Sequence, residues 1–245
     1  MEEMSDNLLK VITKGENEEK TDQGQPKFKR LSSSDAVENN GNCNQVPSSV
    51  TFEEIVCKFR NKNTQSCNIE MKRLIRHISS KKILLQDVSF FDSLLGDREI
   101  SAVVKLLKIS PHIKTLDLSY NRFLIHGSRK IANCLSENGI ANGKYCSLET
   151  LVLKGNQGIG PTGTAAFMSH VASNTCLTSL NIGTCQACQF GWSFGLKNLA
   201  VCLNENKTLK TLDFSNNRIC INQFDHCLVF ENVCKALKRS TIQNI

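Results

Sequence analysis

The sequence predicts an α/β solenoid, an array of stacked units that each contribute one short strand and one helix. An apolar pattern returns five times, and each return is followed by an amphipathic helix. The copies begin 28, 35, 29 and 32 residues apart: Leu85-Val88-Phe90-Ser93, Ile113-Leu116-Leu118-Asn121, Leu148-Leu151-Leu153-Asn156, Leu177-Leu180-Ile182-Cys185 and Leu209-Leu212-Phe214-Asn217. A fixed period in this range is typical of solenoids. One unit cannot bury its apolar side alone, so we expect parallel strands on one side, helices on the other and a continuous core between them.

The composition fits one extended domain with a tail, because the chain has 245 residues of which 40% are hydrophobic. Its formal net charge is +7, and the excess lies after residue 50. A basic surface could bind an acidic protein or nucleic acid. No nucleic-acid motif or aromatic platform accompanies the charge, so a protein partner is favoured over nucleic acid.

The start of the chain and its apolar content predict a cytoplasmic protein, with the nucleus as an alternative. The first 20 residues lack the basic and apolar regions of a secretory signal. No run of about 18 apolar residues exists, so we expect no membrane span. The 12 cysteines should therefore remain reduced.

The first 84 residues are predicted to precede the repeats. Residues 1–50 are polar and should form a disordered tail. Residues 51–84 fit a helical N-terminal cap or a degenerate repeat. The segment Thr51-Phe52-Glu53-Glu54 reads as a capping box, whereas Phe52, Ile55 and Cys57 have the apolar spacing of a repeat. The sequence leaves both readings open.

The repeat domain is predicted to span residues 85–245, with five repeats and the start of a sixth. Thr241–Ile245 parallels Thr208–Leu212, so the sequence stops partway through a further strand. An uncapped end exposes core. We therefore expect either a longer parent protein or end-to-end self-association through the uncapped C-terminus.

Within each repeat, the first, fourth and sixth positions of the pattern should point into the core. The ninth position should place Asn121, Asn156 and Asn217 above one another, where an amide satisfies backbone groups in the turn. Ser93 and Cys185 take the same slot. Alignment of the helices places Cys134, Cys202 and His170 on the buried stripe, so these are predicted to be structural residues.

The units resemble the ribonuclease-inhibitor class of leucine-rich repeats. The turns that carry this resemblance are Leu95-Gly96-Asp97, Ile159-Gly160-Pro161-Thr162-Gly163, Asn121-Arg122 and Asn217-Arg218. The units thereby also resemble the repeats of NOD-like receptors, Ran GTPase-activating proteins and cytoplasmic or ciliary scaffolds, in which this class is found. The resemblance implies a curved α/β horseshoe with inner parallel strands and outer helices. It also implies binding on the concave face or its rim loops.

The candidate partner-binding residues are the side chains expected on the concave face, together with the only tryptophan. The tryptophan stands in an insertion of the fourth repeat, and insertions in solenoids often lie on a binding face. These candidates are Phe91, Asp117, Tyr120, Val152, Lys154, Asn181, Trp192 and Asp213. The alternatives are a solvated sheet and a tryptophan that folds back over the neighbouring helix.

The sequence predicts no enzyme, no cofactor and no metal site. It lacks a phosphate-binding glycine loop, a nucleophile elbow and a zinc-protease motif. The pair Cys185 and Cys188 has a C-x-x-C spacing, and Cys220, His226 and Cys227 follow one repeat later. A metal or redox site is thus the alternative to a structural role. The expected function is a non-catalytic protein-interaction scaffold or sensor.

A GTPase-activating or GTPase-regulating protein of the Ran type is the alternative function. The resemblance to Ran GTPase-activating proteins suggests it, and Arg122 and Arg218 could contact a nucleotide-bound partner. Those proteins have about twice as many repeats and an acidic C-terminal tract, which this sequence lacks.

Overall fold

The computed structural model describes residues 86–136, 147–189, 193–219 and 224–245, with the side chains of 224–227 left out. The predicted tail (1–50) and cap (51–84) lie outside these residues, as do Leu85, Trp192 and the insertion at 137–146. Predictions for those segments remain predictions.

Five short strands form one parallel sheet in sequence order. They are β1 (Asp87–Ser89), β2 (Thr115–Asp117), β3 (Thr150–Val152), β4 (Ser179–Asn181) and β5 (Thr211–Asp213). The central residues Val88, Leu116, Leu151, Leu180 and Leu212 pair in register across all five strands. The predicted alignment of the repeats is therefore confirmed.

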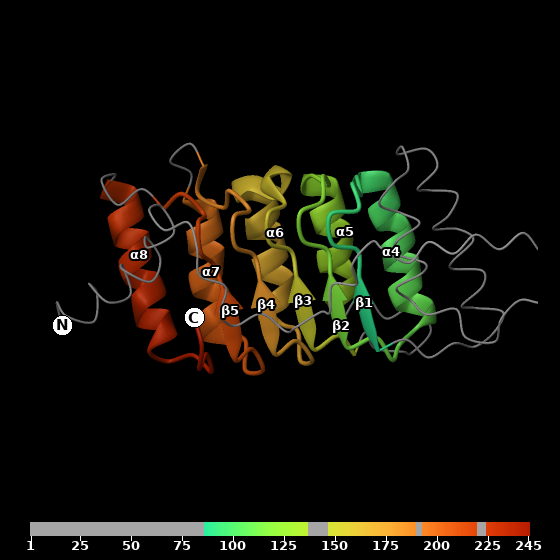
Figure 1. Ribbon diagram of the computed structural model, residues 1–245. Helices are drawn as coiled ribbons and strands as arrows, with labels where there is room; N and C mark the ends of the chain where they lie inside the picture. The colour runs from blue at the N-terminus through green and yellow to red at the C-terminus, as the bar shows by residue number, and fades with distance from the viewer. Residues whose placement is uncertain (1–85, 137–146, 190–192, 220–223) are drawn as a thin grey trace, which may run out of the picture.

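The helices form a second layer against this sheet (Figure 1). They are α4 (Asp97–Ile109), α5 (Ile125–Leu135), α6 (Gly160–Ala172), α7 (Phe194–Glu205) and α8 (Phe224–Leu237), with a short 3-10 helix η3 (Gln157–Ile159) before α6. Each α-helix packs against the next one along the chain. The architecture is the α/β solenoid that the sequence predicts.

The core lies between the two layers and is continuous through the described repeats. Side chains at the first, fourth and sixth pattern positions are buried wherever they are described. Cys134 and Cys202 are buried on the helices, as predicted. The prediction for His170 was wrong in one respect, because its side chain is only half-buried. Its Nδ1 lies 2.7 Å from the Ala166 carbonyl oxygen, one turn back, and this contact holds the ring at the helix surface.

The ninth-position asparagines form the predicted ladder between repeats. Asn121 Nδ2 donates to the carbonyls of Phe90 and Leu118, each at 2.8 Å. Its Oδ1 accepts the backbone N–H of Ser93 and of Leu95. Asn217 repeats the arrangement and accepts the N–H groups of the fourth-repeat turn. These bonds satisfy backbone groups that the turns would otherwise bury unpaired.

A second asparagine ladder, which the sequence analysis missed, lies at the opposite end of the strands. Asn174 Nδ2 donates to the Leu135 carbonyl at 2.6 Å, and its Oδ1 accepts the N–H of Leu177. Asn206 donates to the Val171 carbonyl and accepts the N–H of Leu209. Both residues stand three positions before the first leucine of a repeat, a recurrence that could have signalled the role.

The segment after α8 returns to lie beside the start of β5. Asn244 forms a parallel bridge with Thr211, and Gln243 N–H donates to the Lys210 carbonyl at 2.7 Å. Thr241 Oγ1 donates to the Leu209 carbonyl, as Thr208 Oγ1 does to the Leu177 carbonyl. In the described part of the chain, no helix has the length and apolar character needed to cross a membrane.

Candidate protein-binding surface

The strand face is the side of the sheet that points away from the helices. Because successive side chains of a strand alternate between faces, it carries the residues on either side of each buried strand centre. The strand register aligns them in two rows, Asp87-Thr115-Thr150-Ser179-Thr211 and Ser89-Asp117-Val152-Asn181-Asp213. Four predicted candidates, Asp117, Val152, Asn181 and Asp213, thus lie side by side, and all four are half-buried.

The polar members of the second row are held in place by a recurring local hydrogen bond. Asp117 Oδ1 accepts the N–H of Ser119 at 2.8 Å. Asn181 Oδ1 accepts the N–H two residues later at 3.0 Å, and Asp213 Oδ1 does so at 2.9 Å. This is the Asx-type bond that favours Asp and Asn where a strand turns away. The same atoms therefore shape the turn and present an oriented polar group on the strand face.

An aromatic pair stands at the edge of the strand face where the chain turns toward the helices. Phe91 is 37% exposed and Tyr120 is 46% exposed. Their ring centroids are 5.5 Å apart, with an interplanar angle of 67°. Edge-to-face contacts of this kind are favourable beyond the area they bury. Two of the predicted candidates are thus in direct contact and remain accessible.

The position of the Tyr120 ring depends on Gly155 in the next repeat. Tyr120 has a φ of +55°, which is unusual for a residue with a side chain. A Cβ added to Gly155 would lie 2.6 Å from Tyr120 Cδ1, and Gly155 itself has a φ of +78°. Gly155 therefore supplies both the left-handed backbone and the space that the ring occupies.

Leu124 is a further exposed apolar residue, which the sequence analysis missed. Its side chain is 53% exposed, and a Cβ added to Gly158 would meet its Cδ2 at 2.4 Å. Leu124 immediately precedes α5. No periodic pattern marks such a position, because it belongs to neither the strand nor the buried helix stripe.

The row that follows the strands mixes accessible and enclosed positions. It comprises Phe91, Ser119, Lys154, Gly183 and Ser215. Ser119 and Gly183 are buried, whereas Lys154 is half-buried. The Oγ of Ser119 donates to Asp117 Oδ1 at 2.5 Å. The two predicted candidates in this row, Phe91 and Lys154, can both contact a partner. The remaining candidate, Trp192, belongs to none of the rows and lies outside the described residues.

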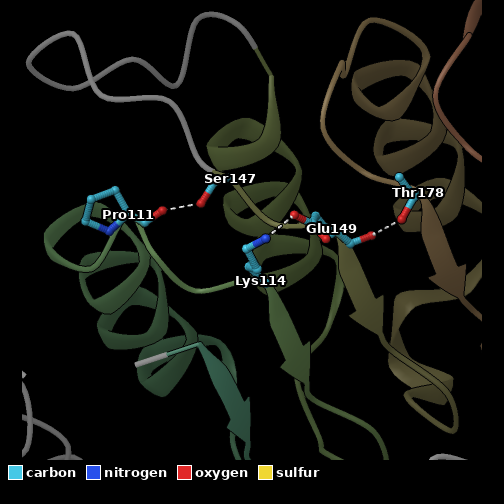
Figure 2. A network of polar contacts seen from close by, with 5 residues as sticks. All are labelled: Pro111, Lys114, Ser147, Glu149 and Thr178. Carbon is cyan, nitrogen blue, oxygen red and sulfur yellow. Dashed lines mark hydrogen bonds and ion pairs between the residues drawn. The ribbon is translucent and has the colours of Figure 1, made fainter. Parts of the chain in front are cut away.

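The opposite edge of the strand face carries a polar network (Figure 2). Lys114 Nζ lies 2.7 Å from Glu149 Oε1. The hydrogen bond to Glu149, and then the charge of that carboxylate, raise the pKa of Lys114. Thr178 Oγ1 donates to the Glu149 carbonyl at 3.1 Å, and the Ser147 hydroxyl donates to the Pro111 carbonyl. The Lys114–Glu149 pair is half-exposed, so it orients this edge but contributes little stability.

Cys185 and Cys188 are both buried. Burial raises the pKa of each thiol to about 12. Cys185 occupies the ladder slot, where its Sγ donates to the Leu153 carbonyl at 3.3 Å. Among the described residues, no group of three or more His, Cys, Asp or Glu side chains could hold a metal ion. The side chains of Cys220, His226 and Cys227 lie outside them.

Comparison with known proteins gives a family match and a set of structural neighbours. A family model described as "Leucine Rich repeat" matches residues 110–124, 146–168 and 205–219, which contain β2, β3 and β5. No curated protein shows a significant match.

Thirty-seven chains of solved structures are similar to this chain. One is "Leiomodin-1 Actin-Binding Site 2 (ABS2)", with 19% identity, coverage of 67% of this chain and 86% of that chain, and a TM-score of 0.49. Another is the tropomodulin C-terminal domain of Caenorhabditis elegans, with 11% identity, coverage of 77% and 92%, and a TM-score of 0.35. Nothing about a partner follows from likenesses of this size.

Proposed function

We propose that this chain, in which three segments match a leucine-rich repeat family model, binds a protein partner through the strand face and the aromatic pair of Phe91 and Tyr120 at its edge. The observation that carries this proposal is the exposed Phe91–Tyr120 contact, held in one geometry by Gly155. Tyrosine is enriched among the residues that dominate binding energy at protein interfaces. A rigid, accessible aromatic group loses little conformational entropy when it binds.

The chemistry of the surface fits a partner with an apolar anchor and a polar surround. Apolar side chains occupy one edge of the strand face, and Asp117, Asn181 and Asp213 lie in the row beside it. An interface of this type buries an apolar centre within a hydrogen-bonded rim. We assign the repeats to the ribonuclease-inhibitor class, since units of 28 to 35 residues each carry a full α-helix. We also propose that the protein is located in the cytoplasm or nucleus.

The proposal includes that this surface binds a partner without catalysing a reaction. Asp117 and Asp213 lie three strand steps apart, roughly 14 Å at about 4.8 Å per step, which is too far for shared acid–base chemistry. Arg122 and Arg218, on which the GTPase-regulating alternative rests, follow the same two strands and are equally separated. No observation on the described residues favours that alternative.

The proposal is tested by quantitative affinity capture with a matched pair of variants. Tyr120→Ser removes the aromatic group, whereas Val201→Ser removes an apolar group that is 45% exposed on α7, on the other layer. We expect captured proteins that depend on the strand face to be lost with Tyr120→Ser and retained with Val201→Ser. Equal capture by both variants would contradict the proposal. Stimulation of GTP hydrolysis by the intact chain would favour the GTPase-regulating alternative instead.

Two glycines provide an independent control for the position of the ring. Gly155→Ala imposes a positive φ on alanine and drives its Cβ into Tyr120. Gly160→Ala imposes similar backbone strain at a φ of +60°, but nothing lies within 4 Å of its Cβ. Each variant should lose about 1–3 kcal/mol of stability. We expect Gly155→Ala alone to lose partner capture, because it alone displaces the ring.

A further inference from the structure

A basic surface lies on the helix layer, over the first two described helices. Helices α4 and α5 pack side by side (Figure 1). Every Lys and Arg side chain on these two helices is exposed. These side chains, which we call the basic face, are Arg98, Lys105, Lys108, Arg129 and Lys130. Positive charge is thus concentrated over a short stretch of the helix layer.

The carboxylates on the same two helices are turned toward backbone donors. Glu99 is buried, and its Oε2 accepts the Gly96 N–H at 3.0 Å. Asp97 is half-buried, and its Oδ1 accepts two backbone N–H groups at the start of α5, each at 2.8 Å. Helix α5 itself contains no acidic residue. The fully exposed charges of the two helices are therefore all positive.

Four of the five basic side chains, all but Lys130, have no hydrogen-bond or ion-pair partner in the described part of the chain. Lys130 Nζ donates to the Asp97 carbonyl at 3.1 Å and to Ser101 Oγ at 2.6 Å. This contact joins the two helices and holds one positive charge between them. Like charges gathered on one surface repel each other, and a bound anionic group would relieve the repulsion.

The basic face is small, because α6, the next helix, does not continue it. Helix α6 contains no Lys, Arg, Asp or Glu. A helix as long as α4 extends about 20 Å, and two packed helices are about 20 Å wide. The resulting area of roughly 400 Å² is less than the roughly 600–1,000 Å² that a single nucleic-acid-binding module buries. Neither α4 nor α5 contains Phe, Tyr or Trp on which a base could stack.

We propose that the basic face binds an acidic segment of another protein, in which Asp and Glu side chains recur over about six residues. Such a segment spans about 20 Å when it is extended, which matches the length of α4. Arg98 and Arg129, one on each helix, carry planar guanidinium groups that can pair with a carboxylate through two parallel hydrogen bonds. The basic face lies on the other layer from the strand face, so this proposal does not depend on the proposed function.

The test measures binding of a fluorescent peptide of about ten glutamates, which is longer than the basic face when extended, to the full chain by anisotropy. We expect saturable binding that weakens as salt is added, because salt screens exposed charges. A peptide with glutamine in place of every glutamate should not bind. Lys105→Gln combined with Arg129→Gln removes one charge from each helix. This double variant should weaken binding roughly tenfold, the size expected for two exposed ion pairs.

A matched control separates the basic face from the net charge of the chain. Lys197→Gln combined with Lys210→Gln changes the net charge equally at exposed positions outside the basic face, and it should leave binding unchanged. All four side chains are exposed, so urea unfolding should be the same for both double variants.

The absence of saturable binding would overturn the proposal, as would equal weakening by the two double variants. At physiological salt, a DNA duplex or phosphatidylcholine vesicles containing phosphatidylserine might bind more tightly than the glutamate peptide. If Lys105→Gln combined with Arg129→Gln also weakened that binding, the proposal would be overturned, and nucleic acid or a membrane surface would be the occupant instead.

Discussion

A single asparagine residue can join three successive repeats. The Asn121 side chain bonds to backbone groups of the first repeat and to the Leu118 carbonyl of its own repeat. Its backbone N–H donates to Asn156 Oδ1 in the third. The side-chain amide can bond to two repeats because it carries an acceptor and two donors on one rigid plane. Cysteine at position 185 satisfies only part of this set, through its Sγ.

Replacing Asn156 with alanine should therefore be costly. Asn156 is fully buried, its Nδ2 donates to the Leu118 and Leu153 carbonyls, and its Oδ1 accepts the Asn121 N–H. Each buried group left unpaired costs about 1–3 kcal/mol, so Asn156→Ala should lose at least about 3 kcal/mol in urea unfolding. Asn156→Cys should lose less. Gln157→Ala, at the exposed neighbouring position, should change stability by less than about 0.5 kcal/mol, and an equal loss there would refute the ladder's role.

Among the secondary-structure elements, one helix can supply the cap of the helix in the next repeat. Helix α5 has no side-chain cap of its own and no acidic residue in its first turn. Asp97, at the start of α4, takes this role across the repeat boundary. Its Oδ1 accepts the N–H groups of Leu124 and Gly127, both at 2.8 Å. The negative charge also lies where the helix dipole of α5 favours it.

Removal of this shared cap should weaken α5 and not α4 alone. Asp97→Ala should lower the free energy of unfolding by about 1–2 kcal/mol, the range found for loss of a helix cap. Asp97→Asn keeps an oxygen acceptor and should recover most of the loss. Asp87→Ala, at an exposed strand position in the same repeat, serves as the control. Chemical denaturation of the three variants measures the effect, and equal losses for Asp97→Ala and Asp87→Ala would argue against a cap.

At the scale of the whole molecule, periodicity made much of the structure predictable. The strand centres, the buried cysteines and the asparagine slots recur at fixed positions, so one sequence shows each of them several times. A left-handed backbone also recurs at one position of every repeat, at Asp92, Tyr120, Gly155, Thr184 and Asn216, but the residue types there share no pattern that would reveal it. The cap from Asp97 depends instead on a contact between unequal repeats. The rows of side chains on the strand face could be predicted because they follow from the periodicity of the strands. The exposure of Leu124 and the burial of Ser119 could not, because they depend on local contacts.

A stacked solenoid should also unfold unevenly, because each unit is stabilised by its neighbours. Helix α6 packs against both α5 and α7, whereas α8 has only α7 beside it among the described helices. Stability in such arrays is approximately a sum of unit and nearest-neighbour energies. The amides of α8 and of residues 240–245 should therefore open at a lower free energy than those of α6.

Native-state hydrogen exchange in increasing urea would measure this gradient. We expect α8 to exchange through a partial opening whose free energy depends on urea less steeply than global unfolding, since it exposes less surface. Helix α6 should exchange only through the global transition. Destabilising the centre by Leu180→Ala, which empties a fully buried position in β4, should cost about 2–5 kcal/mol and lower the protection of α6. If α6 and α8 instead share one opening free energy at all urea concentrations, the solenoid unfolds as a single cooperative unit and the nearest-neighbour description fails.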